Sequence, residues 1–172
     1  MLKILRHIVS TGLVSEAVPE ADDALRLRSG LHARLLDVLG RSLAIRHVDA
    51  GSCNGCELEL HALNNSIYNI EGLGIRFVAS PRHADLLLVT GPVSRHMDAA
   101  LQRTYEAMPD PKLVVAVGDC GCTGGIFGES YACRGPVSGV IPVDVAVPGC
   151  PPNPTRLLQG ILAAVTHPHD GT

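Results

Sequence analysis

Short, almost continuous aliphatic segments set the strongest limit on the fold of this chain. Residues 85–91 and 112–118 are built largely of Leu, Val and Ala, without the polar alternation of a strand that has one face in water. Such runs are typical of parallel strands covered by helices on both faces. We expect two further buried strands at 74–79 and 143–148, and 45–50 is a plausible fifth. Together these segments predict a parallel sheet.

Helical patterns lie between these strands, at about 57–70, 97–107 and 154–166. The last pattern has a clear start, because Asn153 is a good N-cap residue and Pro154 suits the first helical position. Alternation of strand and helix predicts an α/β fold with helices on both faces of the sheet.

The N-terminal part of the chain has a different pattern. Apolar residues recur at helical spacing over residues 22–43, which predicts an amphipathic helix. We expect residues 1–44 to form an N-terminal extension with this helix, docked on a partner or on a membrane surface, or simply packed as an ordinary helix. Residues 45–172 are expected to form a single domain, which suits a chain of 172 residues.

Composition excludes several classes of function. The net charge of -3 provides no general basic surface, so we expect no nucleic-acid partner. Neither a G-x-G-x-x-G nor a G-x-x-x-x-G-K-[ST] motif is present, which leaves nucleotide binding unsupported. No segment has the roughly 20 apolar residues of a membrane span, and the first residues do not resemble an export signal. We therefore expect a cytoplasmic protein, held at the inner face of the membrane by partner subunits.

The six cysteines carry the candidate chemistry. Thiols stay reduced in the cytosol, so metal binding or redox chemistry is a better interpretation than disulfides. Cys53 follows the segment 45–50, and the pair Cys53 and Cys56 is separated by two residues. Cys120 and Cys150 follow the segments 112–118 and 143–148. Because ligands of parallel sheets collect at the carboxyl ends of the strands, we expect these loops to form one site.

The type of site is open between three chemistries. A zinc site and a thioredoxin-like redox pair both use two cysteines separated by two residues. An iron–sulfur cluster uses all four cysteines, and its sulfurs need close backbone approach, which glycines permit. Glycines stand beside the cysteines at positions 55, 121, 124, 125 and 149, and they favour the cluster.

Cys122 and Cys133 remain outside the expected ligand set. Cys122 is only two positions from Cys120, and the two cysteines could not easily reach the same corner of a cluster. We choose Cys120 as the ligand. A free cysteine is often a small buried apolar residue.

Two acidic residues and two histidines lie close to the first cysteine pair in sequence. We expect Glu57 to complement the dipole at the start of a helix. Glu59 either does the same or serves beside the cluster in hydrogen bonding or proton relay. His47 and His61 are expected to be structural histidines with satisfied hydrogen bonds.

Three motifs together resemble a known superfamily. They are Asp-Ala-Gly-Ser-Cys-Asn-Gly-Cys-Glu-Leu-Glu at 49–59, Gly-Asp-Cys at 118–120 with Gly-Gly-Ile-Phe at 124–127, and Val-Pro-Gly-Cys-Pro-Pro at 147–152. This combination is similar to the [NiFe]-hydrogenase small subunit and the complex I 20-kDa subunit. The spacing of the first two cysteines is that of hydrogenases, and the chain most resembles small subunits of group 4 membrane-bound hydrogenases of the hydrogenase-4 and formate hydrogenlyase type.

The resemblance implies a flavodoxin-like fold and a proximal [4Fe–4S] cluster. Cys53, Cys56, Cys120 and Cys150 fall on its ligand positions, and Glu59 falls on an acidic position of the motif. The implied role is electron transfer in an oxidoreductase complex, with no catalytic centre in this chain. The implied partners are a hydrogenase or complex I-like large subunit, a ferredoxin-like iron–sulfur subunit and membrane subunits. The alternative is a complex I-type subunit that passes electrons to quinone.

Overall fold

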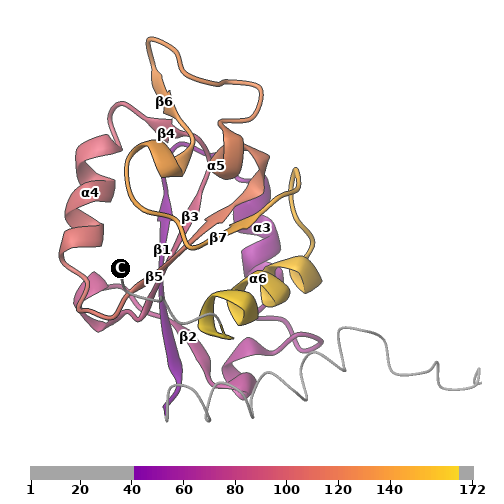
Figure 1. Cartoon of the computed structure of the whole chain (residues 1–172). Helices are drawn as coiled ribbons and strands as arrows, with labels where there is room; N and C mark the ends of the chain where they lie inside the picture. The colour runs from indigo at the N-terminus through magenta and orange to yellow at the C-terminus, as the bar shows by residue number, and fades with distance from the viewer. Residues whose placement is uncertain (1–40, 167–172) are drawn as a thin grey trace, which may run out of the picture.

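A parallel sheet forms the centre of the structure, a computed structural model that describes residues 41–166 (Figure 1). Its strand order is β2-β1-β3-β5-β7, and all neighbouring strands run parallel. This is the flavodoxin-like order, in which the chain changes direction of winding between the first and third strands. The strands are β1 (Leu43–Asp49), β2 (Ile75–Phe77), β3 (Leu86–Thr90), β5 (Leu113–Val117) and β7 (Val145–Val147). The predicted α/β fold is confirmed.

Helices cover both faces of this sheet, as the continuous aliphatic strands require. On one face, α3 (Gly55–Ala62) and α6 (Pro154–Thr166) pack against Ile45, Leu88 and Val117. On the other face, α4 (Asp98–Glu106) inserts Leu101 among Leu87, Val89 and Val114. Figure 1 shows α4 on one side of the sheet and α3 with α6 on the other. All five residues of β3 are buried, because this strand lies at the centre of the sheet.

The helix α6 has the predicted limits. The Asn153 side-chain oxygen accepts a hydrogen bond from the backbone N–H of Arg156 (2.9 Å), which is the N-cap bond that the sequence predicts. The helix then begins at Pro154 and ends at Thr166.

The predicted helix 57–70 is wrong at its C-terminal end. α3 ends at Ala62, and a short 3-10 helix, η1 (Ile70–Leu73), precedes β2. The Asn65 side chain accepts hydrogen bonds from the backbone N–H groups of Ile67 and Tyr68, both at 2.9 Å. Asparagine side chains offer the backbone this alternative to helical hydrogen bonds, and the segment therefore turns.

The predicted N-terminal helix 22–43 lies outside the described residues except for its last three positions. These positions are not helical, because Arg41 and Ser42 lead directly into β1 at Leu43. The sheet thus starts two residues earlier than the segment 45–50.

Three elements near the carboxyl ends of the strands were not predicted. They are the strand pair β4 (Val93–Ser94) and β6 (Cys133–Gly135), which is antiparallel, and the short helix α5 (Gly118–Thr123). Two further 3-10 turns, η2 (Pro81–His83) and η3 (Val137–Gly139), lie in connections. All of these elements are too short to show a hydrophobic period.

Gly160 provides a test of how closely α6 packs on the sheet. A Cβ atom at this position would lie 2.2 Å from Cγ2 of Val147, the last residue of β7. Alanine is a better helix former than glycine by about 1 kcal/mol, yet overpacking typically costs about 1–3 kcal/mol. We expect Gly160→Ala to lower the free energy of unfolding, measured by urea denaturation with circular dichroism. Gly139→Ala is the control, since nothing lies within 4 Å of its Cβ position; an unchanged or higher stability of Gly160→Ala contradicts this packing.

Candidate functional site

The four predicted ligand cysteines line one cavity at the carboxyl edge of the sheet. The cavity has a volume of about 150 Å³ and is bounded by the segments that follow β1, β3, β5 and β7. Its wall includes Cys53, Cys56, Cys120 and Cys150, together with the exposed side chain of Phe127. The convergence of distant cysteine loops expected from the sequence is therefore present in the structure.

The first cysteine loop is ordered by short-range hydrogen bonds. The Asp49 carboxylate accepts from the backbone N–H groups of Gly51 (2.8 Å) and Ser52 (2.7 Å), and the Ser52 hydroxyl accepts from Asn54 N–H (3.1 Å). Asn54 has a left-handed backbone, with φ of 71°, and α3 begins directly after it. Cys56 consequently lies in the first turn of α3, where unpaired N–H groups and the helix dipole favour negative charge.

The second cysteine loop forms the helix α5, and the helix directs the side chains of its two cysteines to different sides. Cys120 and Cys122 lie two residues apart on α5, and residues at that spacing face different sides of a helix. Cys120 lines the cavity. The Cys122 Sγ atom lies 3.6 Å from the carbonyl oxygen of Ala116, and its side chain packs against the core beneath α4.

Hydrogen bonds join the second cysteine loop to the third. The Asp119 N–H donates to the carbonyl oxygen of Gly149 (2.9 Å), and the Asp119 carboxylate accepts from Gly149 N–H (2.8 Å). These two bonds place Cys120 and Cys150 beside each other. Asp119 stands within the Gly-Asp-Cys motif at 118–120, but the sequence predicted no role for it; its position directly after a strand and before a cysteine was the available signal.

Glycines leave space for the sulfur atoms. A Cβ atom on Gly118 would lie 2.7 Å from Cys56 Sγ, and one on Gly125 would lie 2.8 Å from Cys120 Sγ. Both glycines have positive φ, +83° and +56°, which other residues rarely adopt. Glycine is therefore required at both positions, because a side chain would collide with a cysteine sulfur and because the backbone has positive φ.

The thiols interact electrostatically. Burial raises the pKa of the Cys56 thiol to about 12, together with the negative charges of Glu57, Cys53, Cys120 and Cys150. Each thiol that ionises makes the ionisation of its neighbours harder. A bound metal reverses this effect, because its positive charge favours the thiolate form that coordinates it.

The pKa of Cys120 is also raised, first by burial and then by the negative charges of Cys150, Cys53 and Asp119.

Cys133 lies elsewhere, on β6 opposite Ser94 of β4, and is not part of the cavity wall. Among residues 41–166, no group of three His, Cys, Asp or Glu side chains is placed so that it could hold a single metal ion.

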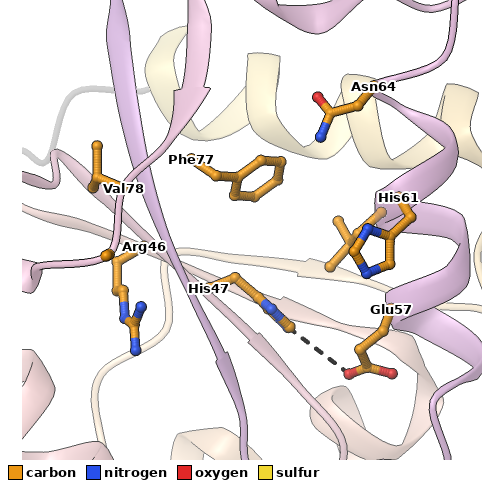
Figure 2. A pocket seen from close by; sticks show the side chains of 9 residues that line it. Arg46, His47, Glu57, His61, Asn64, Phe77 and Val78 are labelled. Carbon is orange, nitrogen blue, oxygen red and sulfur yellow. Dashed lines mark ion pairs between the residues drawn. The ribbon is translucent and has the colours of Figure 1, made fainter.

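A second cavity lies beside the first cysteine loop, and we call it the Glu57 pocket (Figure 2). It has a volume of about 360 Å³ and lies between β1, α3 and the segment that follows β2. Its wall contains His47, Glu57, Leu60, His61 and Phe77. Glu57 occupies the first turn of α3, as the sequence predicts, but it is also buried, with an exposed fraction of 7%. Its burial was not predicted.

The two histidines and the second glutamate differ in their surroundings. His47 Nε2 lies 2.9 Å from the Thr90 hydroxyl, so the expected hydrogen bond of this histidine is present. Burial lowers the pKa of His47 below its ordinary value, although Glu57 and Asp49 act in the opposite direction. His61 is exposed. Glu59 is half-buried and lines neither cavity, so its role in hydrogen bonding or proton relay stays a prediction.

The fold is a flavodoxin-like sheet with a cysteine cavity at its carboxyl edge, and the proteins that this chain resembles are subunits of oxidoreductase complexes. The chain belongs to the family of the 20 Kd subunit of NADH ubiquinone oxidoreductase, whose model matches residues 53–164. The resemblance inferred from the three motifs is thereby confirmed.

Individual relatives come from hydrogenases and from quinone oxidoreductases. The chain is 47% identical over 133 residues to the probable membrane-bound hydrogenase subunit mbhJ of Pyrococcus furiosus, covering 77% of this chain and 80% of that protein. It is 43% identical over 137 residues to formate hydrogenlyase subunit 7 of Escherichia coli, covering 80% of this chain and 54% of that protein. It thus spans about half the length of this second relative. A subunit of the NADH-quinone oxidoreductase of Heliobacterium modesticaldum is 48% identical over 108 residues, 62% of each protein.

Solved structures with the same fold include two complexes. A chain of the archaeal membrane-bound sulfane sulfur reductase, a respiratory membrane complex, aligns with a TM-score of 0.63 and 33% identity over 84% of this chain and 75% of that chain. A chain of an NAD+-reducing [NiFe]-hydrogenase in the H2-reduced state aligns with a TM-score of 0.58 and 19% identity, over 75% of this chain and 97% of that chain, which shows the shared fold. In the part of this chain that the structure describes, no helix has the length and apolar character needed to span a membrane.

Exposure and pKa predict the order in which the thiols react. In metal-free protein at neutral pH, we expect iodoacetamide to modify the exposed Cys53 and Cys150 first. Cys56 and Cys122 should react last, because burial and a raised pKa keep little thiolate available. A time course followed by peptide mass spectrometry measures the order, and urea-unfolded protein is the control in which the differences disappear. Modification of Cys122 as fast as Cys150 is incompatible with the position of its side chain.

Proposed function

We propose that this chain is the electron-transfer subunit of a membrane-associated hydrogenase complex of the formate hydrogenlyase type, and that it carries one [4Fe–4S] cluster. The proposed ligands are Cys53, Cys56, Cys120 and Cys150. The observation that carries the proposal is the cavity in which these four thiols, from three distant segments of the chain, meet.

The residues of the cavity fit such a cluster. Four thiols supply its ligands, and a [4Fe–4S] cluster held by four thiolates takes up and gives back one electron at a time when bound. Gly118 and Gly125 leave room beside the sulfurs of Cys56 and Cys120. The first turn of α3 provides N–H groups and the positive end of a helix dipole near Cys56. The chain's own groups thus hold, orient and electrostatically support the cluster, and we propose no catalytic centre in this chain.

The surface near the cavity suits contact with partner subunits. Phe127 lines the cavity and is 54% exposed, and its neighbour in sequence, Ile126, is 93% exposed. Exposed large apolar side chains close together mark interaction surfaces. Relatives are named as subunits of membrane-bound hydrogenase and formate hydrogenlyase. We therefore propose a hydrogenase-like large subunit, a ferredoxin-like iron–sulfur subunit and membrane subunits as partners, which hold the chain at the inner face of the membrane.

Electron transfer to quinone is the second candidate function. It is favoured by the relatives named as subunits of NADH-quinone oxidoreductase, at 48% and 45% identity. The two residues between Cys53 and Cys56 favour the hydrogenase. The large subunit that copurifies with this chain discriminates between the two functions, because two Cys-x-x-Cys pairs that hold nickel belong to a hydrogenase.

Paired alanine variants test the ligand set. After anaerobic expression with the partner subunits, we expect the wild-type chain to bind iron and sulfide and to show the EPR signal of a reduced [4Fe–4S] cluster. Cys120→Ala should lose this signal, because it removes a proposed ligand, whereas Cys122→Ala should keep it, because its Sγ points away from the cavity. Zinc in place of iron in the anaerobic wild-type protein, or signal loss in Cys122→Ala with retention in Cys120→Ala, refutes the proposed site.

Paired glycine variants test the space for the cluster. Gly118→Ala places a methyl group against Cys56 Sγ, and Gly128→Ala changes a glycine of positive φ (+54°) with nothing within 4 Å. Both variants carry the backbone strain of a non-glycine residue at positive φ, of order 1–3 kcal/mol. We expect only Gly118→Ala to lower iron and sulfide per folded chain, measured after anaerobic purification. Equal iron content in the two variants would show that the space beside Cys56 is not needed.

A further inference from the structure

The Glu57 pocket contains a buried carboxylate without a hydrogen-bond partner. The Glu57 side chain is 9% exposed, and neither of its carboxylate oxygens has a hydrogen-bond partner among the described residues. A buried carboxylate is expensive to leave unpaired, because it has lost its hydration without replacement. The pocket volume of about 360 Å³ is far more than one water molecule needs.

The side chains around Glu57 do not supply the missing donor. His47 Nε2 is 3.8 Å from Glu57 Oε1, which is too long for a hydrogen bond. The same nitrogen lies 2.9 Å from the Thr90 hydroxyl, which in turn donates to the carbonyl oxygen of Val48 at 3.5 Å. The N–H of His47 is therefore directed to Thr90. Arg46 also lines the pocket, and its Nε likewise has no hydrogen-bond partner among the described residues. Figure 2 shows His47 between the Arg46 side chain and Glu57, so Arg46 does not pair with the carboxylate.

The rest of the pocket wall indicates what kind of donor fits. Phe77 offers an aromatic ring, and Leu60 and Val78 offer aliphatic surface. A planar guanidinium group pairs with a carboxylate through two parallel hydrogen bonds and is attracted to aromatic rings. The aliphatic stem of an arginine packs on apolar surface while its charged end reaches a polar group.

We propose that the Glu57 pocket receives the guanidinium group of an arginine from a partner subunit. A partner subunit is the source we choose because the relatives of this chain are subunits of multisubunit membrane complexes. The cation neutralises Glu57 and fixes the partner directly beside the first cysteine loop, since Glu57 follows Cys56 in the chain. The proposal rests on the partner subunits of the proposed function but not on the cluster, so a chain that binds no cluster would leave it untouched.

Benzamidine is a suitable probe, because it joins an amidinium cation to an aromatic ring. Saturation-transfer NMR with the purified full chain should detect benzamidine binding, and neutral benzamide should bind at least about tenfold more weakly, because it lacks the charge-assisted pair. Glu57→Gln should weaken benzamidine binding by a similar factor. Glu71→Gln, which removes an exposed carboxylate of η1 that does not line the pocket, should leave binding unchanged.

Two outcomes with the isolated chain overturn the proposal. One is the absence of benzamidine binding, or equal binding of benzamidine and benzamide. The other is unchanged binding in a Glu57→Gln variant whose circular dichroism matches the wild type. Should that variant fail to fold, the benzamidine and benzamide comparison on the wild-type chain still tests the charge requirement.

The assembled complex identifies the source of the cation. With partner subunits bound, an arginine in the pocket should exclude benzamidine, so the NMR signal of binding should disappear. If benzamidine binds the purified complex as strongly as it binds the isolated chain, no partner arginine occupies the pocket. That result overturns the proposal.

Discussion

Parallel pairing of β3 with β1 on one side and β5 on the other determines where the chemistry of this chain lies. Because the five strands of the central sheet are parallel, the segments that follow them emerge at one edge of that sheet. Cys53, Cys120 and Cys150 follow β1, β5 and β7 and therefore meet there. The hydrogen bonds between Asp119 and Gly149 then fix the two later cysteine loops to each other. The cavity is thus a consequence of sheet topology, refined by a few local bonds.

Much of this arrangement was predictable from sequence, because its causes are local. The strands β3 and β5 are buried on both faces, and burial leaves them almost purely aliphatic in sequence. The start of α6 depends on Asn153 and Pro154 alone, so its limits follow from neighbouring residues. Convergence of the cysteine loops required only that the strands be parallel.

Other features depend on packing that the sequence does not display. The helix α5 consists of Gly-Asp-Cys-Gly-Cys-Thr and has no hydrophobic period, yet its geometry separates Cys120 from Cys122. Cys120 is the choice from sequence spacing, and the helix is what places Cys120 on the cavity wall. The burial of Glu57 arises from the packing of α3 over β1, and a glutamate in the first turn of a helix is usually exposed. The early end of α3 depends on the side-chain hydrogen bonds of Asn65.

The distribution of the cysteine cavity along the chain has a consequence for biosynthesis. Its wall is assembled from segments that begin near Cys53 and end at Pro151, and β7 adds its strand to the sheet edge just before Cys150. The last wall segment therefore leaves the ribosomal exit tunnel only after the chain has been synthesised beyond Pro151. No N-terminal fragment that ends before Cys150 contains all four thiols, so any bound group that needs all four must enter after translation has passed β7. A chain that terminates before Cys150 therefore has an incomplete binding site.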